Sequence, residues 1–299
     1  MPEPLLIGVD GGGTQCRARL CDLAGKVLGE GAGGPANVRL EPERVMGSIL
    51  AASRAAAAAA GLSDDELSRA HAGFGLAGGL LKSACDRLLA EPNPFASIRI
   101  ATDAYAAWLG AFRGGDGAIL ILGTGSCGLA VVGGQEFYVG GWGAEVSDEA
   151  SGHAIGREAI RRALWAHDGR ATATPLAAAL ISRCGGSGES VIAFATAARP
   201  ADYAALVPLV LEHAAARDPL ALALVAEAAA DAVRIIARLL EVGAPSVALI
   251  GGLAEPLSAW LPPPIRQGLV KPRGDALDGA ILMARRAVAT DRAAAIEAL

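Results

Sequence analysis

Two short segments of the chain combine glycine with a hydroxyl side chain directly after an apolar run. They are Gly11-Gly12-Gly13-Thr14 and Gly123-Thr124-Gly125-Ser126. Glycine lets backbone N–H groups come close to a ligand, and a Thr or Ser hydroxyl supplies a further donor. We therefore expect both segments to bind phosphate groups. Neither has the spacing of a P-loop, and neither opens a helix as a dinucleotide-binding fingerprint does.

Two aspartates stand at the ends of predicted strands. Asp10 precedes the first glycine segment, where a carboxylate could hold magnesium beside phosphates or bond to its own turn. Asp103 follows the short strand predicted at Ile98–Ala101 and precedes a helix. If that strand joins the same parallel sheet, Asp103 lies where α/β proteins bind ligands and could accept a proton from an attacking alcohol. The alternative for Asp103 is a helix N-cap.

A third polar cluster joins Gly140-Gly141-Trp142-Gly143 to Asp148-Glu149-Ala150-Ser151. Small residues permit close approach, and carboxylates bind hydroxyl groups or an ammonium group, so a sugar would suit this cluster. The alternative is a surface loop that leads into a helix capped by Asp148 or Ser151.

Strands and helices must position these groups. In the first part of the chain, apolar runs and turn residues predict strands at 5–9, 16–20, 27–30, 72–77 and 98–101, with helices at 42–60, 80–90 and 104–112. In the second part they predict strands at 118–122, 129–132 and 246–250, helices at 151–167, 218–242 and 278–288, and a rigid proline loop at 262–264. The order of strand, glycine turn and second strand occurs in both parts. This indicates an internal duplication, although two unrelated hairpins would give the same pattern.

Composition narrows the class of protein. The chain has 299 residues, which suggests two domains or one large one. Charged residues make up 19% of the chain and its net charge is −5, and these values argue against intrinsic disorder. They also argue against nucleic-acid or anionic-membrane partners. The five cysteines do not have the spacing of a metal site. The N-terminus does not have the features of a signal peptide, and the apolar run Ala55–Ala60 is too short to span a bilayer. We expect a cytoplasmic protein.

The motifs resemble those of the sugar kinase/Hsp70/actin superfamily. Within it, Asp10–Thr14, Thr102-Asp103-Ala104 and Gly123–Ser126 are similar to the N-acetylglucosamine kinase and BadF-type ATPase group. Further segments are similar to bacterial glucosamine kinases, namely Gly11–Arg19, Pro94–Ser97, Gly123–Gly128, Asp218–Ala221, Trp260-Leu261, Val270–Pro272, Asp275-Ala276 and Gly279-Ala280.

This resemblance implies an α/β fold of two duplicated ribonuclease-H-like (actin-like ATPase) lobes with a cleft between them. The N-terminal lobe would comprise residues 1–112 and 286–299, and the C-terminal lobe residues 113–285. It also implies ATP-dependent phosphorylation of the 6-hydroxyl group of an amino sugar with Mg²⁺, and a possible homodimer.

The resemblance further implies a role for each matching residue. Asp103 would be the general base and Asp10 would hold the metal. The ATP site would include Gly11, Gly12, Gly13, Thr14, Gly123, Thr124, Gly125, Ser126, Gly251 and Gly252. The sugar site would include Asn37, Asp103, Gly140, Gly141 and Asp148.

Three functions remain open at this point. The overall likeness favours glucosamine as the substrate, but Gly140–Gly143 is nearer to the acetylglucosamine pattern. The family pattern G-D-E-G-S is replaced here by Ser147-Asp148-Glu149-Ala150-Ser151. Glucosamine carries an ammonium group that needs a carboxylate, for which Glu145, Asp148 and Glu149 are candidates. The third alternative is an ATPase that activates a partner enzyme, or a sugar-sensing regulator.

Overall fold

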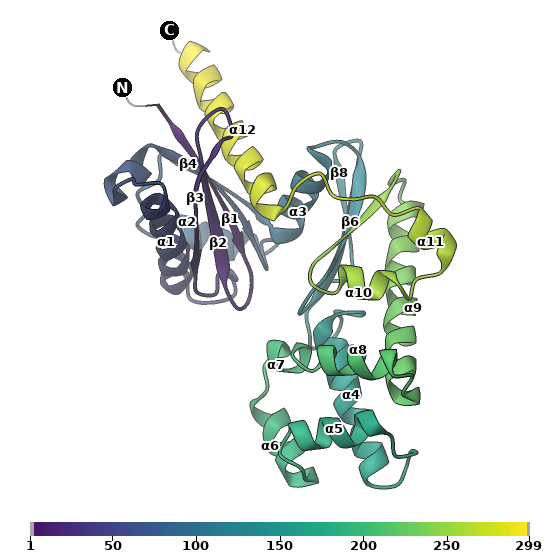
Figure 1. Cartoon of the computed structure of the whole chain (residues 1–299). Coiled ribbons are helices and arrows are strands. Elements are labelled where there is room, and N and C mark those ends of the chain that lie inside the picture. Colours follow the sequence, from purple (N-terminus) through teal and green to yellow (C-terminus); the bar gives the residue numbers. More distant parts are fainter. Residues whose placement is uncertain (1–2, 298–299) are drawn as a thin grey trace. The chain divides into compact units, whose positions relative to one another are not determined.

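The structure is a computed structural model that describes residues 3–297, with side chains up to residue 288. The described chain divides into two units, drawn in Figure 1. The first unit comprises residues up to Gly115 together with those from Pro272, and the second is Asp116–Lys271. The chain returns to the first unit at Pro272, earlier than the expected boundary at residue 286. The physical reason is that the last helix packs on the first unit from its start, since a Cβ added at Gly8 would lie 2.8 Å from the Leu277 carbonyl oxygen.

The first unit is built on a five-stranded sheet in the order β3-β2-β1-β4-β5. Its strands are β1 (Leu5–Gly11), β2 (Cys16–Cys21), β3 (Val27–Gly33), β4 (Ala70–Leu76) and β5 (Ser97–Thr102). Strands β1, β4 and β5 are parallel, while β2 and β3 are added antiparallel as hairpins. Its helices are α1 (Pro42–Ala59), η1 (Asp64–Arg69), α2 (Lys82–Leu89), α3 (Asp103–Phe112) and α12 (Ala276–Glu297).

Helices cover both faces of this sheet, with α1 on one side and α12 on the other (Figure 1). Strand β1 is buried on both faces because its apolar side chains alternate between them. Leu5, Ile7 and Val9 join the core under α1, whereas Leu6 packs with Ile281 of α12. This alternation fixes which way Asp10 at the end of β1 can face.

Arg19 of β2 ties the sheet to the beginning of α12. Its guanidinium donates hydrogen bonds to Glu30 at 2.6 Å, Asp278 at 2.8 Å and Asp275 at 3.0 Å. Burial pushes the pKa of Asp275 upward, but the Asp278 N–H and Arg19 outweigh it and hold this pKa below its ordinary value. The chain segment that re-enters the first unit is therefore fixed by charge as well as by packing.

The second unit repeats the strand arrangement of the first. Its sheet has the order β8-β7-β6-β9, with β6 (Gly117–Leu122), β7 (Ser126–Val132), β8 (Gln135–Val139) and β9 (Val247–Ile250). Strands β6, β7 and β8 form consecutive antiparallel pairs like β1, β2 and β3, and β9 lies parallel to β6 as β4 does to β1. The predicted duplication is confirmed in the order and direction of these strands.

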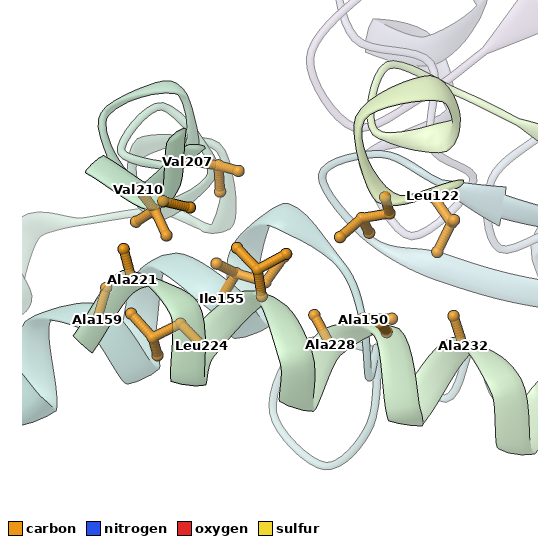
Figure 2. Close-up of a cluster of buried hydrophobic side chains, with 14 of the residues drawn as sticks. Leu122, Ala150, Ile155, Ala159, Val207, Val210, Ala221, Leu224, Ala228 and Ala232 are labelled. Atoms are coloured by element: carbon orange, nitrogen blue, oxygen red, sulfur yellow. The ribbon is translucent and has the colours of Figure 1, made fainter. Parts of the chain in front are cut away.

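Helices dominate the rest of the second unit. They are α4 (Gly152–His167), α5 (Pro175–Arg183), α6 (Gly188–Ala197), α7 (Pro200–Ala204), α8 (Val207–Ala215), α9 (Pro219–Glu241), α10 (Ala254–Ser258) and α11 (Pro263–Gln267). Figure 2 shows the core that they share, in which α9 contributes one row of small and apolar side chains, Ala221, Leu224, Ala228 and Ala232. The rigid loop predicted at residues 262–264 is wrong, because Pro263 begins α11 and proline is tolerated in the first turn of a helix.

Within residues 3–297, no helix combines the length and the apolar composition that crossing a bilayer requires.

Candidate active site

Asp10 and Asp103 lie at the same edge of the first unit's sheet. Asp10 of β1 is paired with Gly75 of β4, and Leu76 of β4 is paired with Thr102 of β5. Because the three strands are parallel, their carboxyl ends meet at one edge, where ligands of α/β proteins bind. The strand before Asp103 thus joins the predicted sheet.

Asp103 is the first residue of α3, but it is not the helix cap. The cap is Thr102, whose Oγ1 accepts a hydrogen bond from the N–H of Tyr105 at 2.9 Å. The alternative that Asp103 serves as the N-cap is therefore wrong. One carboxylate oxygen of Asp103 accepts the N–H of Ala104 at 2.9 Å, and the residue is partly exposed at the sheet edge.

The carboxylate of Asp10 pairs with Arg17 of the neighbouring strand. Arg17 Nη2 lies 2.7 Å from Asp10 Oδ2, so Asp10 bonds across the β1–β2 pair instead of to its own turn. In that turn the Gly12 N–H donates to the Gln15 carbonyl at 3.0 Å, while Gly13 and Thr14 are exposed. Arg17 is not among the residues predicted from the sequence, although a cation opposite Asp10 in a predicted hairpin was the available signal.

Asn37 lies at this edge, beside the end of β4. Its neighbour Val38 donates to the Ala77 carbonyl just after β4, at 3.1 Å. The Asn37 Oδ1 accepts the Arg39 N–H at 2.9 Å and would lie 3.0 Å from a Cβ added at Gly78. Since β4 stands between β1 and β5, the first unit brings Asp10, Asn37 and Asp103 to one edge.

A single carboxylate suits magnesium at this edge of the sheet. No group of three or more His, Cys, Asp or Glu that could hold a metal occurs among the described residues. Mg²⁺ bound beside nucleotides keeps several waters and takes one or two carboxylates together with phosphate oxygens. Asp10, partly exposed beside the glycine turn, fits that requirement.

In the second unit, the Gly123–Ser126 turn is anchored to the start of α4. The carbonyls of Gly123 and Thr124 accept the N–H groups of Gly152 at 2.8 Å and of His153 at 3.0 Å. Ser126 is buried, and its hydroxyl donates to the Glu149 carbonyl at 2.6 Å. Thr124 stays exposed, so its side chain is the accessible hydroxyl of this turn.

Gly251 and Gly252 lie beside that turn, because β9 is parallel to β6 and both strands end at the same edge. The Leu253 N–H donates to the Leu122 carbonyl at 3.0 Å, directly before Gly123. Gly251 has a φ of 103°, and a Cβ added there would lie 2.4 Å from the same carbonyl oxygen. Only glycine fits this conformation and this spacing.

Replacing Gly251 with alanine is expected to displace the turn and weaken ATP binding at least tenfold, since both backbone strain and a steric clash oppose it. Gly268→Ala is the matched control in the same unit, because Gly268 belongs to no proposed site and a Cβ added there would have its nearest heavy atom at 3.5 Å. Isothermal titration with a non-hydrolysable ATP analogue measures both variants. Wild-type affinity in Gly251→Ala would contradict the assignment of this turn to the nucleotide.

Asp148 lies against the Gly123–Ser126 turn. A Cβ added at Gly125 would lie 2.7 Å from Asp148 Oδ2, and the carboxylate accepts the N–H groups of Gly143 and Ser126. Burial raises the pKa of Asp148, and these N–H groups counteract only part of the rise. The cap of α4 is Ser151, whose hydroxyl accepts the Ala154 N–H at 3.1 Å, so the predicted capping role of Asp148 is wrong.

The other two carboxylates of this region lie differently. Glu145 is exposed. Glu149 Oε2 accepts a hydrogen bond from Ser147 Oγ at 2.9 Å and lines a pocket of about 380 Å³. The residues that line this pocket are Val139, Gly140, Trp142, Ser147, Glu149, Asp231, Arg234 and Ile235. The second unit thus brings together the predicted residues Gly123–Ser126, Gly251-Gly252, Gly140-Gly141 and Asp148.

Known proteins resemble this chain over nearly its whole length. Glucosamine kinase GspK of Vibrio cholerae is 40% identical over 278 residues, which are 93% of this chain and 95% of that protein. An N-acetylmuramic acid/N-acetylglucosamine kinase of Clostridium acetobutylicum is 32% identical over 57% of each chain. The crystal structure of a candidate N-acetylglucosamine kinase from Chromobacterium violaceum is 40% identical, with a TM-score of 0.89 over 94% of this chain and 99% of that one.

These similarities confirm the predicted α/β fold of the actin-like ATPase class. Residues 7–284 match the BadF/BadG/BcrA/BcrD ATPase family. This matched range includes both glycine turns and both edge aspartates. The chain therefore belongs to the BadF/BadG/BcrA/BcrD ATPase family.

Proposed function

We propose that the protein is an ATP-dependent kinase that phosphorylates the 6-hydroxyl group of glucosamine, giving glucosamine 6-phosphate and ADP. The observation that carries this proposal is the 40% identity to a glucosamine kinase over 93% of the chain. The placement of Asp103 supports it, because a partly exposed carboxylate at the ligand-binding edge of a sheet can act as a general base.

In the proposed reaction the 6-hydroxyl oxygen attacks the γ-phosphorus of ATP. The bond from that phosphorus to the bridging oxygen of ADP breaks as the new oxygen–phosphorus bond forms, and Asp103 accepts the hydroxyl proton. Asn37, Gly140, Gly141 and Asp148 bind the sugar. The glycine turns at 11–14 and 123–126 bind the phosphates, and Gly251-Gly252 adjoins the adenosine.

Asp10 would hold a magnesium ion, directly or through water, and the bound ion would supply positive charge beside the phosphates. In the described structure the same carboxylate forms an ion pair with Arg17, whose Nη2 lies 2.7 Å from Asp10 Oδ2.

The second candidate substrate is N-acetylglucosamine. It is favoured by the Gly140–Gly143 sequence and by the named substrate of the Clostridium relative. An ADP-release assay with glucosamine, N-acetylglucosamine, N-acetylmuramate and glucose separates the candidates. We expect the highest kcat/KM for glucosamine. Comparable rates for the other three sugars and none for glucosamine would refute the proposal.

A control without sugar tests the ATPase-activator alternative. A kinase hydrolyses ATP slowly when no acceptor is present and forms a phosphosugar when one is added. Fast ATP hydrolysis that is independent of sugar, with no phosphosugar product by mass spectrometry, would favour an activator or a regulator instead.

We also propose a cytoplasmic location, which is supported by the five cysteines, since they form no disulfide in the described chain and cysteines without disulfides are typical of reducing compartments. The homodimer stays a prediction that light scattering of the purified protein can test.

A further inference from the structure

The pocket beside Gly140 has a charge that suits a cationic ligand. Among the described residues that line it, two are carboxylates, Glu149 and Asp231, and one is a cation, Arg234. Arg234 pairs with Asp231 on the same helix, α9. Glu149 is instead held by the neutral hydroxyl of Ser147 at 2.9 Å. The lining therefore carries one negative charge in excess.

The field of these two carboxylates favours a further positive charge. Burial raises the pKa of Asp231, and the charge of Glu149 raises it further, while Arg234 opposes both. A bound ammonium group would relieve this repulsion and complete the pairing of Glu149.

The shape and rim of the pocket suit a monosaccharide. Its volume of about 380 Å³ is at the small end of the range for ligand sites. Trp142 stands on the rim with 66% of its surface exposed, and an indole face can pack on the apolar face of a sugar ring or on a cation. Gly140 links the pocket to the proposed sugar site, and a Cβ added there would have its nearest neighbour, Glu149 Oε2, at 3.9 Å.

The backbone separates the two adjacent carboxylates. Asp148 has a φ of 63°, and Ala150 has a φ of 64°. As a result, the Asp148 carboxylate lies against Gly125 and accepts N–H groups of Gly143 and Ser126, whereas Glu149 lines the pocket. Asp148 is therefore already paired with backbone donors.

We propose that Glu149 binds the 2-ammonium group of the amino-sugar substrate in the pocket formed with Trp142, Ser147 and Asp231. This inference rests on the proposed function and assigns the residue that distinguishes glucosamine from neutral hexoses. Glu149 is a binding residue and takes no part in the proton transfer.

The test compares Glu149→Gln with the wild-type protein in the ADP-release assay and in calorimetric titrations with glucosamine and with glucose. The variant keeps the size and one acceptor of the side chain but loses its charge. We expect the KM and Kd for glucosamine to rise at least tenfold, since hydrogen bonds to charged groups are the stronger ones. We expect the Kd for glucose, which has no ammonium group, to change less than twofold.

Two further variants sharpen the result. Glu149→Asp retains the charge and is expected to recover part of the glucosamine affinity. Glu241→Gln removes a carboxylate from the exposed end of α9 and is expected to match the wild type. A glucosamine Kd in Glu149→Gln within twofold of the wild type, or an equal loss for glucose, would overturn the inference alone. Wild-type protein that neither binds nor phosphorylates an amino sugar would overturn the proposed function as well.

Discussion

Replacing Asp103 with asparagine is expected to lower kcat for sugar phosphorylation by about 10²–10⁴-fold, the usual contribution of a general base. The amide cannot accept the proton of the 6-hydroxyl group. Its oxygen can still accept the Ala104 N–H, and Thr102 still caps α3, so the fold should be unchanged. Affinity for ATP should stay within about twofold of the wild type, because the phosphate-binding turns are untouched.

The measurement pairs steady-state ADP release with calorimetric titration of an ATP analogue. Asp86→Asn is the matched control, since Asp86 is an exposed residue of α2 that pairs only at the surface with Lys82. The control should retain full activity. A kcat in Asp103→Asn near that of the control would remove Asp103 as the base, and loss of ATP binding would show that it serves the nucleotide instead.

The second large effect concerns the contact between α3 and α12. A Cβ added at Gly279 of α12 would lie 1.8 Å from the Ala106 carbonyl oxygen of α3 and 2.7 Å from the Gly110 nitrogen. These are backbone atoms, so the clash can be relieved only by moving one helix. Gly279→Ala is therefore expected to lower the free energy of unfolding by about 3 kcal/mol, the upper part of the range for overpacked cores.

Gly47→Ala is the control for helix propensity in the same unit. Gly47 lies inside α1, and a Cβ added there meets nothing within 4 Å. Alanine should stabilise that helix by about 1 kcal/mol. Urea unfolding followed by circular dichroism gives both values on the same unit. Equal stability of Gly279→Ala and the wild type would show that the two helices are not packed as closely as described.

Local sequence patterns predicted much of the fold. Apolar runs next to glycine turns placed β1, β6 and β7 within a few residues, and alternating apolar residues placed β2, because each pattern reflects only neighbours in the chain. Asp218-Pro219 correctly marked the start of α9, where the Asp218 carboxylate accepts the N–H groups of Leu220 and Ala221. The four helices between residues 175 and 215 were missed, since short alanine-rich segments carry little periodicity.

The sequence by itself determined the kinds of groups present, namely two glycine turns for phosphates, edge aspartates and a glycine–carboxylate cluster for a sugar. It could not determine which of Glu145, Asp148 and Glu149 faces a ligand. The directions in which these side chains point depend on left-handed backbone at Asp148 and Ala150, a conformation that is uncommon for alanine and that contacts far along the chain support. Among these contacts are the bond from Ser126 to the Glu149 carbonyl and the packing of Asp148 against Gly125. Side-chain direction in this loop is a tertiary property, because it depends on partners more than twenty residues away.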